Sequence, residues 1–574
     1  MSYRPPLGEF HFLLSQVVGY GAVQETERFG DADDDTSAAI LAEAGKLSAD
    51  VLAPLRRVGD QEPARLENGV VRTAPGFADA YGQVAAGGWI SVAAPAAYGG
   101  MGLPVTLQTA VNDMMSAANL GLHTGILLSQ GQIEAIAAHA SEDLKAIYLP
   151  RLIAGEWMAT MNLTEPQAGS DVGALTSRAE PAGDGSYRIT GRKIYITYGD
   201  SDLAENVVHL VLARLPGAPA GTRGISLFLV PKRLPDAEGQ AGAANALRVA
   251  GLEHKMGLHA SPTCTMEFDG ATGWLVGEEG GGMAAMFTMM NNARLSVGVQ
   301  GVGVACAASQ AALDWASERR QGRSPLPEGS ATGAIVDHAD VRRMLGQMRA
   351  ETFAARALTL ACAVAIDMAR ATGAKGWADR AALLTPIAKA HGTEVGHRVA
   401  QEAIQVLGGM GYIEEAGVAQ YARDVRVAAI YEGTNGIQAM DLVGRKLADG
   451  GEAAFRLIDE IQDGAEAARC TLDGLAAPVW SAAEALREAT ERAVAQNMQD
   501  RFAGAVPYLQ AMARLLGAHH HLRAACAPSG PDARQPLAEL YIRRILPEVT
   551  GLVSAASLGA ADLYALTPED LSAA

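Results

Sequence analysis

One carboxylate, Glu432, stands between an apolar run and the predicted start of a helix. The apolar residues from Val427 to Tyr431 disfavour the charged form of a carboxylate, so we expect the pKa of Glu432 to be raised, as suits a general base. Gly433 leaves space for a substrate. Thr434 is a predicted N-cap, and the free N–H groups of a helix start favour an anion. The alternative is an ordinary capping turn with a solvated glutamate.

A second polar segment, from Asn162 to Asp171, contains hydroxyl groups and a glycine, Gly169. Side-chain hydroxyls and exposed backbone N–H groups can hydrogen-bond a flat heterocycle or an anion. About 25 residues later, the run from Lys193 to Thr197 offers an aromatic side chain and another hydroxyl. The alternative for each segment is a plain loop and strand.

Other common site signatures are missing from the chain. Gly301 and Gly303 begin a dinucleotide-like pattern, but Cys306 stands where its third glycine belongs. There is no P-loop, no H-E-x-x-H and no G-x-S-x-G pattern. The consecutive histidines 519–521 fan around a helix, so we predict a partly exposed face and no metal site.

Composition limits the class of protein. A chain of 574 residues predicts about three or four domains. Its net charge of -18 disfavours nucleic acid and anionic membranes as partners. The five cysteines are scattered singly, which indicates a reducing compartment. With no apolar leader and no apolar run long enough for a membrane span, we expect a cytoplasmic protein without stable membrane insertion.

The periodicity of apolar residues changes along the chain and predicts four domains. Short strand-like runs fill the second domain, including Tyr187 to Thr197, Val207 to Leu215, Gly224 to Val230 and Cys264 to Phe268. Helical spacing holds on both sides of it. The predicted boundaries are 1–158 (helical, with an N-terminal extension), 159–275 (β), 276–448 (helical bundle) and 449–574 (additional helices).

Four motifs in this order make the chain resemble the acyl-CoA dehydrogenases. They are Met161 to Pro166 with Gly169-Ser170-Asp171, Gly191 to Thr197, Gln405 to Tyr412, and Tyr431 to Thr434. The resemblance covers residues 36–447, and the C-terminal tail is similar to that of the larger members. Residues 3–6 and 209–232 look most like the branch named for 3-methylmercaptopropionyl-CoA dehydrogenase.

The resemblance implies an α+β multidomain fold: an N-terminal helical domain, a middle β-barrel-like domain, a C-terminal four-helix bundle and an extra helical domain. It implies FAD as cofactor, held between the β domain and the second helical domain. The residues it implies for FAD are Met161, Leu163, Thr164, Gly169, Ser170, Tyr195, Thr197, Arg319, Gln321, Gln405, Gly409 and Thr434. Among these, Arg319, Gln321, Gln405 and Gly409 would bind the FAD pyrophosphate or adenosine, either of their own subunit or of a neighbouring one.

The same resemblance implies acyl-CoA contacts from Ser170, Asn292, Arg294, Tyr431 and Gly433. A buried structural ion pair is the alternative for Arg294. Two positions depart from the family's pattern: Met161 replaces a common aromatic residue, and Gly436 stands where several relatives have glutamine. Some branches keep the base on an earlier helix, but residues 290–294 contain no carboxylate. Glu432 therefore remains as the catalytic base.

In the family's reaction, Glu432 would take the α-proton of an acyl-CoA while the β-hydride passes to FAD, giving a trans-2-enoyl-CoA. The Glu432 backbone N–H and a flavin ribityl hydroxyl would bind the thioester oxygen. Electron-transferring flavoprotein is the implied acceptor, and a homodimer the implied assembly. Substrates left open are 3-(methylthio)propanoyl-CoA and short to long fatty acyl-CoAs. Two alternatives also stay open: an acyl-CoA oxidase using oxygen, and a catalytically silent flavoprotein.

Overall fold

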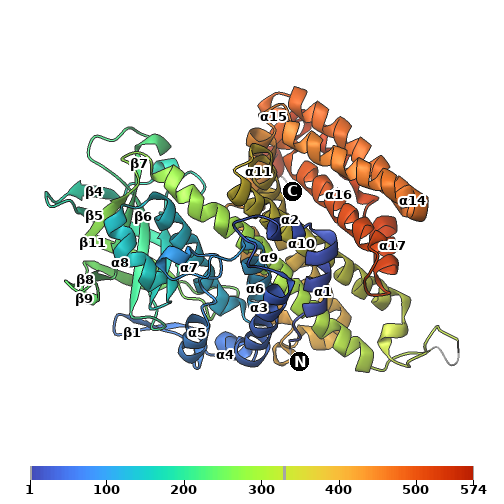
Figure 1. Ribbon diagram of the computed structural model, residues 1–574, viewed down its shortest axis with the longest axis horizontal. Coiled ribbons are helices and arrows are strands. Elements are labelled where there is room, and N and C mark those ends of the chain that lie inside the picture. Colours follow the sequence, from blue (N-terminus) through green and yellow to red (C-terminus); the bar gives the residue numbers. More distant parts are fainter. Residues whose placement is uncertain (1–2, 328–330, 573–574) are drawn as a thin grey trace. The chain divides into compact units, whose positions relative to one another are not determined.

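The computed structural model describes residues 3–327 and 331–572, which divide into two compact units (Figure 1). Residues 3–5 and 40–296 form one unit, called here the β-containing unit. Residues 6–39 and the described residues of 297–572 belong to the other, called the helical unit. Helices α3 (Asp34–Leu47) and α9 (Gly282–Glu318) run from one unit into the other. Our four domain boundaries stay predictions.

A seven-stranded sheet forms the centre of the β-containing unit. Its strands run in the order β10-β11-β5-β4-β6-β3, and β7 pairs with both β11 and β6, which closes a barrel-like ring. The bounds are β3 (Trp157–Asn162), β4 (Arg178–Pro181), β5 (Tyr187–Thr197), β6 (Asn206–Arg214), β7 (Ile225–Pro231), β10 (Leu247–Leu252) and β11 (Thr263–Val276). The predicted β region is confirmed, and the predicted strand Tyr187 to Thr197 is β5 itself.

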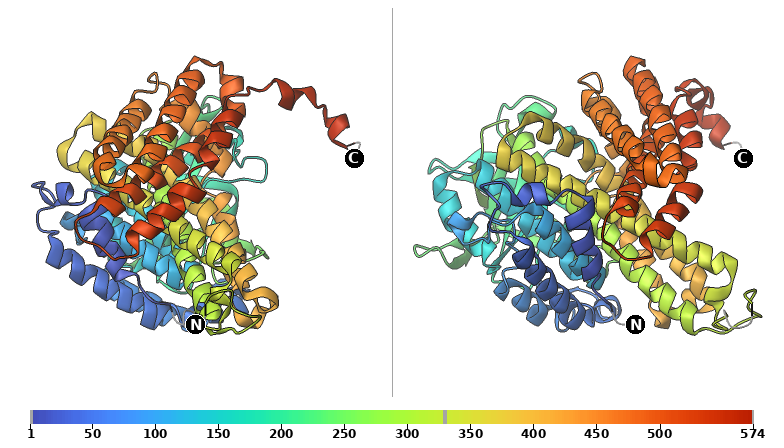
Figure 2. Two further views of the ribbon diagram at one scale, coloured as in Figure 1. Left: turned by 90° about the vertical axis from the view of Figure 1, so that its right-hand side faces the viewer. Right: turned by 45° about the vertical axis from the view of Figure 1, so that its right-hand side comes forward.

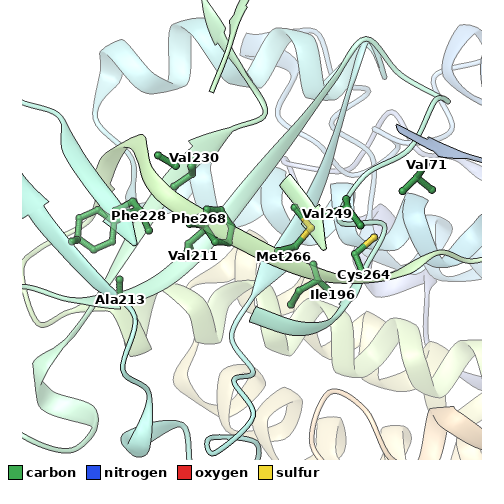
Figure 3. Close-up of a cluster of buried hydrophobic side chains, with 13 residues drawn as sticks. Val71, Ile196, Val211, Ala213, Phe228, Val230, Val249, Cys264, Met266 and Phe268 are labelled. Atoms are coloured by element: carbon green, nitrogen blue, oxygen red, sulfur yellow. The ribbon is translucent and has the colours of Figure 1, made fainter. Parts of the chain in front are cut away.

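The sheet folds around a buried apolar cluster (Figure 3). Phe228 on β7, Val211 on β6 and Phe268 on β11 lie within it, each with less than 4 % of its surface exposed. Strands β6 and β7 are almost continuously apolar and are buried along nearly their whole length, as expected for strands covered on both faces. This packed layer gives β3 and β5 a rigid support.

Helices and a small hairpin complete the β-containing unit. The helices are α4 (Leu55–Gln61), α5 (Phe77–Ala86), α6 (Val105–Ala118), α7 (Leu120–His139) and α8 (Glu142–Ile153). Asn119 caps α7 by accepting from Leu122 N at 3.2 Å. The hairpin β1 (Arg65–Glu67) and β2 (Val70–Arg72) lies inside the stretch that we predicted as mostly helical. Because α7 contacts β3, it supports the strand that leads into the first motif.

The helical unit contains the bundle and the C-terminal helices. The helices wholly inside it are α1 (Leu7–Phe12), α2 (Gly21–Gln24), α10 (Ala339–Thr372), α11 (Lys375–Leu407), α12 (Ala419–Val425), α13 (Asn435–Asp441), α14 (Glu452–Ala495), α15 (Met498–Ala503), α16 (Ala505–Cys526), α17 (Arg534–Arg544), α18 (Glu548–Ala556), α19 (Ala561–Ala565) and α20 (Pro568–Ser572). Strands β8 (Arg233–Pro235) and β9 (Ala241–Ala244) pair with each other, and both belong to the β-containing unit. The predicted return to helices after the β region is confirmed.

Glycines allow α9 and α11 to cross at very short range. A Cβ at Gly392 of α11 would lie 2.3 Å from Gly298 O, and one at Gly301 of α9 would lie 2.1 Å from Gly392 O. Real Cβ atoms do not approach backbone atoms this closely, so larger side chains would push the helices apart. Gly301, part of the incomplete dinucleotide-like pattern, therefore serves helix packing.

The N-terminal segment is fixed to the helical unit by Glu9 in α1. Its buried carboxylate accepts from Arg356 at 2.5 Å and from Arg534 at 3.2 Å, and it pairs with Arg349. Burial opposes ionisation, but the Arg349 and Arg356 guanidinium groups hold the pKa of Glu9 well below its usual range. This cluster explains why residues 6–39 belong with α10 and α17.

Helix α16 packs against α14, α17 and α18, and these C-terminal helices are orange to red in Figure 2. His519, His520 and His521 are each no more than 4 % exposed, so the prediction of a partly exposed histidine face is wrong. Burial lowers the pKa of His519 and of His521 to about 4, so both rings are neutral at pH 7. His521 Nε2 lies 3.0 Å from Ala350 O, within hydrogen-bond distance. The three rings fill the centre of the C-terminal helices.

Two helices, α9 and α10, are long and apolar enough to cross a membrane by length and composition alone. In each, 89 % of the apolar window is buried inside the protein. Core helices of folded domains have the same property, so this pattern is weak evidence for a membrane span.

Candidate active site

Glu432 lies in a short loop between the turn η9 (Arg426–Ala429) and helix α13. Its φ is +56°, in the left-handed region that non-glycine residues rarely adopt. Such a conformation costs about 1–3 kcal/mol and persists only where the surroundings impose it. Thr434 caps α13 by accepting from Ile437 N at 3.2 Å, which confirms the predicted N-cap. The half-buried Glu432 therefore stands two residues before the N-cap of α13.

Gly433 is required by the shape of this loop. Its φ is +84°, and a Cβ there would lie 2.7 Å from Gln438 Nε2. The same Gln438 amide donates to Glu432 O and Gly433 O, at 3.3 Å each. Lys389 Nζ also donates to Gly433 O, at 2.8 Å. The glycine thus allows buried donors to approach the loop backbone. The space that it leaves for a substrate stays a prediction.

Tyr431 fixes the other side of Glu432. Its hydroxyl donates to Gln300 Oε1 on α9. Burial raises the pKa of Tyr431, and the nearby Glu432 carboxylate adds to the effect, so the phenol stays protonated as a donor. Ile430, by contrast, is 52 % exposed, so the predicted apolar run is only partly shielded from solvent.

The first two motifs lie together in the β-containing unit. Met161 is the next-to-last residue of the buried strand β3, with 9 % of its surface exposed, and the half-buried Leu163 and Thr164 follow the strand. Thr160 Oγ1 donates to Thr197 O at 2.6 Å, and Ile194 N donates to Thr164 O at 2.9 Å. The structure therefore brings the end of β3 beside the end of β5, as a site built from both motifs requires.

A buried ion pair supports this arrangement. Lys193 Nζ donates to Glu165 Oε1 at 2.8 Å and to Leu163 O at 3.0 Å. Burial opposes ionisation of Glu165, but the Lys193 ammonium and the Ser177 hydroxyl lower the pKa of its carboxyl to about 2. Burial lowers the pKa of Lys193 to about 8, against the effect of Glu165, so the ammonium remains charged at neutral pH. Both ions are also satisfied by hydrogen bonds, as buried charges require.

Three further predicted residues lie at the surface of this unit. Tyr195 is 62 % exposed and has a φ of +60°, a second left-handed position at the predicted site. Gly169 and Ser170 are exposed on the loop after β3. No described heavy atom lies within 4 Å of where a Gly169 Cβ would stand, so the loop backbone is open to a ligand.

Asn292 and Arg294 lie on the part of α9 that belongs to the β-containing unit. Asn292 Nδ2 donates to Glu134 Oε2 at 2.8 Å. Arg294 is 5 % exposed, donates to Asn291 Oδ1 at 3.3 Å and lies over the Phe287 ring. Its substrate role stays a prediction.

Four predicted FAD residues of the helical unit are exposed. Arg319 stacks on Trp315 with its guanidinium carbon 5.9 Å from the ring centre, and Gln321 O lies 2.8 Å from His338 Nε2. Gln405 is exposed on α11, and Gly409 in the turn η7 (Gly408–Tyr412). Polar and cationic groups suit a pyrophosphate or an adenosine.

The residues of the two motifs suit an FAD ring. Half-buried Leu163 and buried Met161 offer apolar contact, Tyr195 offers an aromatic face, and Thr164 and Thr197 carry hydroxyls on neighbouring segments. A flat heterocycle needs this combination of apolar surface and a few fixed polar groups. The donor chemistry therefore fits the cofactor.

Sequence reasoning missed the groups that hold these segments. Glu165 and Lys193 lie inside two of the four motifs, yet only the structure shows their ion pair. No motif in the sequence assigns Lys389 or Gln438 to the site. The available signal was a charged residue, Lys389, in the apolar stretch from Leu383 to Ala390.

Family models match most of the chain. They are "Acyl-CoA dehydrogenase, N-terminal domain" at residues 38–156, "Acyl-CoA dehydrogenase, middle domain" at 160–271, "Acyl-CoA dehydrogenase, C-terminal domain" at 280–447 and "Acetyl-CoA dehydrogenase C-terminal like" at 457–567. The last match includes most of the C-terminal helices.

Similar proteins agree with these matches. The 3-methylmercaptopropionyl-CoA dehydrogenase of Ruegeria pomeroyi is 44 % identical over 522 residues, which are 89 % of this chain and 88 % of that protein. A Caenorhabditis elegans ACDH-11 structure in complex with C11-CoA has a TM-score of 0.79 at 21 % identity, covering 94 % of this chain and 92 % of that one. A Bacillus anthracis acyl-CoA dehydrogenase complexed with FAD has a TM-score of 0.76 at 20 % identity, covering 98 % and 94 %.

Proposed function

This chain belongs to the acyl-CoA dehydrogenase family, whose members bind FAD, and we propose that it converts an acyl-CoA thioester to a trans-2-enoyl-CoA with Glu432 as the base. The observation that supports this most is the loop of Glu432. Glu432 is left-handed there, and its loop accepts hydrogen bonds from Lys389 and Gln438 and donates one, through Tyr431, to Gln300. A glutamate with a strained backbone, in a loop held by hydrogen bonds on both sides, is typical of a positioned catalytic group.

Glu432 removes the α-proton, and its backbone position determines whether its carboxylate can reach that proton. A thioester α-proton is weakly acidic, so the base must be held at hydrogen-bond distance and the developing oxygen charge must be stabilised. The Glu432 backbone N–H is the donor that we assign to the thioester oxygen. FAD, when bound, accepts the β-hydride. Leu163 and Thr164 would hold the cofactor, and Thr197 would supply a hydroxyl beside them.

The substrate is proposed from a relative. The Ruegeria pomeroyi protein is named for 3-methylmercaptopropionyl-CoA, so 3-(methylthio)propanoyl-CoA is the first candidate, followed by short to long fatty acyl-CoAs. Electron-transferring flavoprotein is the proposed acceptor. We further propose a cytoplasmic homodimer, which the exposed Arg319, Gln321 and Gln405 would suit if they bind a neighbouring subunit's FAD.

The test is an anaerobic titration of the FAD-loaded protein with single acyl-CoAs, following loss of the flavin absorbance. The panel contains 3-(methylthio)propanoyl-CoA and straight-chain butanoyl- to palmitoyl-CoA. We expect at least one to bleach the flavin and to yield the matching enoyl-CoA by mass spectrometry. No bleaching by any member would contradict the proposed reaction on these substrates. Repeating the productive titration in air distinguishes an oxidase, which would produce stoichiometric hydrogen peroxide.

A further inference from the structure

We propose that Lys389 on α11 is a positioning residue for Glu432, holding the loop so that the carboxylate reaches the α-proton. The inference rests on the proposed function, because it assumes that Glu432 is the base. It assigns a kinetic role to a side chain that acts through the loop backbone.

The burial of Lys389 is the first argument. Its surface is 0 % exposed, although lysine is among the residues that are almost never fully buried. Burying an ammonium costs free energy unless hydrogen bonds replace its lost hydration. An apolar residue would fill the same place on α11 without that cost. The chain therefore keeps a costly group at this position, which calls for a role beyond packing.

The targets of the Lys389 ammonium are the second argument. Nζ donates to Gly433 O at 2.8 Å and to Asn435 Oδ1 at 3.0 Å, so it holds residues on both sides of Thr434. Asn435 is fixed to α11 again, because its Nδ2 lies 3.1 Å from Thr393 Oγ1. Charge-assisted hydrogen bonds are roughly twice as strong as neutral ones. The strongest anchor of the loop thus acts on the residue next to Glu432.

The backbone of the loop is the third argument. Glu432 and Gly433 are consecutive residues with positive φ, +56° and +84°. The left-handed conformation at Glu432 is intrinsically unfavourable, so the loop would relax if its anchors were removed. The Glu432 side chain would move with it. A displacement of about 1 Å from the productive geometry can reduce a rate by about 100-fold.

The close crossing of α9 and α11 makes this anchor rigid. Gly392 lies three residues after Lys389 and contacts the backbone of Gly298, and Gln300 on the same part of α9 accepts from Tyr431. The two helices that hold the loop therefore cannot slide without steric clash. Lys389 and Gln300 fix it from α11 and α9.

The experiment compares Lys389→Met with Lys375→Met, the same substitution at an exposed position of the same helix. For each FAD-loaded variant, the rate of anaerobic flavin bleaching is followed as a function of acyl-CoA concentration. We expect Lys389→Met to lower the limiting rate about 10- to 100-fold, with the FAD content and the apparent acyl-CoA dissociation constant changed less than about threefold. Lys375→Met should match the wild type in all three quantities.

Two results would overturn the inference. One is a limiting rate of Lys389→Met within about twofold of the wild type. The other is a loss of FAD content and thermal stability that accounts for the whole loss of rate, since a purely structural lysine would act in that way. Should Lys389→Met fail to fold, Asn435→Ala removes the second acceptor instead. We expect it to slow bleaching about three- to tenfold at unchanged acyl-CoA affinity, and an unchanged rate would equally overturn the inference.

Glu432→Gln separates this inference from the proposed function. If Glu432→Gln keeps the wild-type rate, the base assignment is wrong, and the inference about Lys389 falls with it. If Glu432→Gln is inactive while Lys389→Met keeps the wild-type rate, only the inference about Lys389 fails.

Discussion

Two buried lysines hold the segment proposed to bind FAD and the loop of the proposed base, and they do so differently. In the β-containing unit, Lys193 forms an ion pair with Glu165 and also donates to Leu163 O. In the helical unit, Lys389 donates to Gly433 O and to Asn435 Oδ1. The first lysine lies in a charge pair inside a sheet, whereas the bonds of the second run to the loop of the proposed base.

The difference predicts different roles for the two lysines. Glu165 also accepts from the backbone N–H and hydroxyl groups of Thr176 and Ser177, so the Lys193 network ties three segments of the β-containing unit together. Its loss should mainly cost stability and cofactor binding. The Lys389 bonds are concentrated on residues 433–435, so their loss should mainly cost rate. The comparison therefore predicts separable effects for two similar substitutions.

The largest stability effect is expected for Lys193→Met. The substitution leaves the buried Glu165 carboxylate without its cationic partner, which typically costs about 3–5 kcal/mol. We expect a clear fall in the thermal unfolding midpoint and in FAD content. The exposed neighbour provides the control, Arg192→Met, which should behave like the wild type. A Lys193→Met protein with wild-type stability and full FAD content would contradict the role in stability and cofactor binding that we assign to Lys193.

The same ion pair predicts a pH dependence of stability. The pKa of Glu165 is lowered from 4.5 to about 2, so its contribution is fully present above about pH 4.5 and is lost as the pH falls toward 2. The stability difference between the wild type and Glu165→Gln should therefore shrink over that range. Urea midpoints measured at several pH values test this. A constant difference would mean that the carboxylate is not stabilised in its charged form.

A smaller effect is expected for Gly392→Ala at the helix crossing. The new Cβ would lie 2.3 Å from Gly298 O, and overpacking of this kind typically costs about 1–3 kcal/mol. Because α11 carries Lys389, we expect the limiting bleaching rate to fall as well. Gly376→Ala on the same helix is the control, since no described atom lies within 4 Å of its Cβ position. Equal stability of the two variants would show that the crossing tolerates a side chain.

The smallest effect is expected for Tyr431→Phe, which removes the bond to Gln300 and leaves the ring in place. A single hydrogen bond contributes about 0.5–1.5 kcal/mol, so we expect the bleaching rate to fall about two- to tenfold. Tyr564→Phe, at a 72 % exposed position, serves as the control. A loss as large as that of Lys389→Met would mean that α9 holds the loop as firmly as α11.

Local signals in the sequence predicted much of the fold. Strand β5 and the N-cap Thr434 were both predicted, since each depends on nearby residue types. The four motifs also indicated the family, which the family models confirm. The roles of the individual site residues stay predictions. The segments around Met161 and Thr197 are described within the β-containing unit, and the Glu432 loop is described within the helical unit.

Features that depend on distant contacts were not predicted. The histidines 519–521 are buried because α14, α17 and α18 surround α16, which no local pattern records. The attachment of residues 6–39 depends on Glu9 meeting arginines about 340 to 525 positions away. Lys389 and Gly433 are likewise 44 residues apart. Single-sequence periodicity cannot detect such pairs, because it reports the environment of a residue without its partner.

The most direct test of the account compares anaerobic flavin bleaching in the wild type and in Glu432→Gln, both loaded with FAD, using the most productive acyl-CoA. Glutamine keeps the size of the side chain but cannot accept the α-proton. A positioned base typically contributes about 100- to 10,000-fold, so we predict a loss of at least that order with FAD content unchanged. A Glu432→Gln protein that bleaches at the wild-type rate would contradict the assignment of Glu432 as the base.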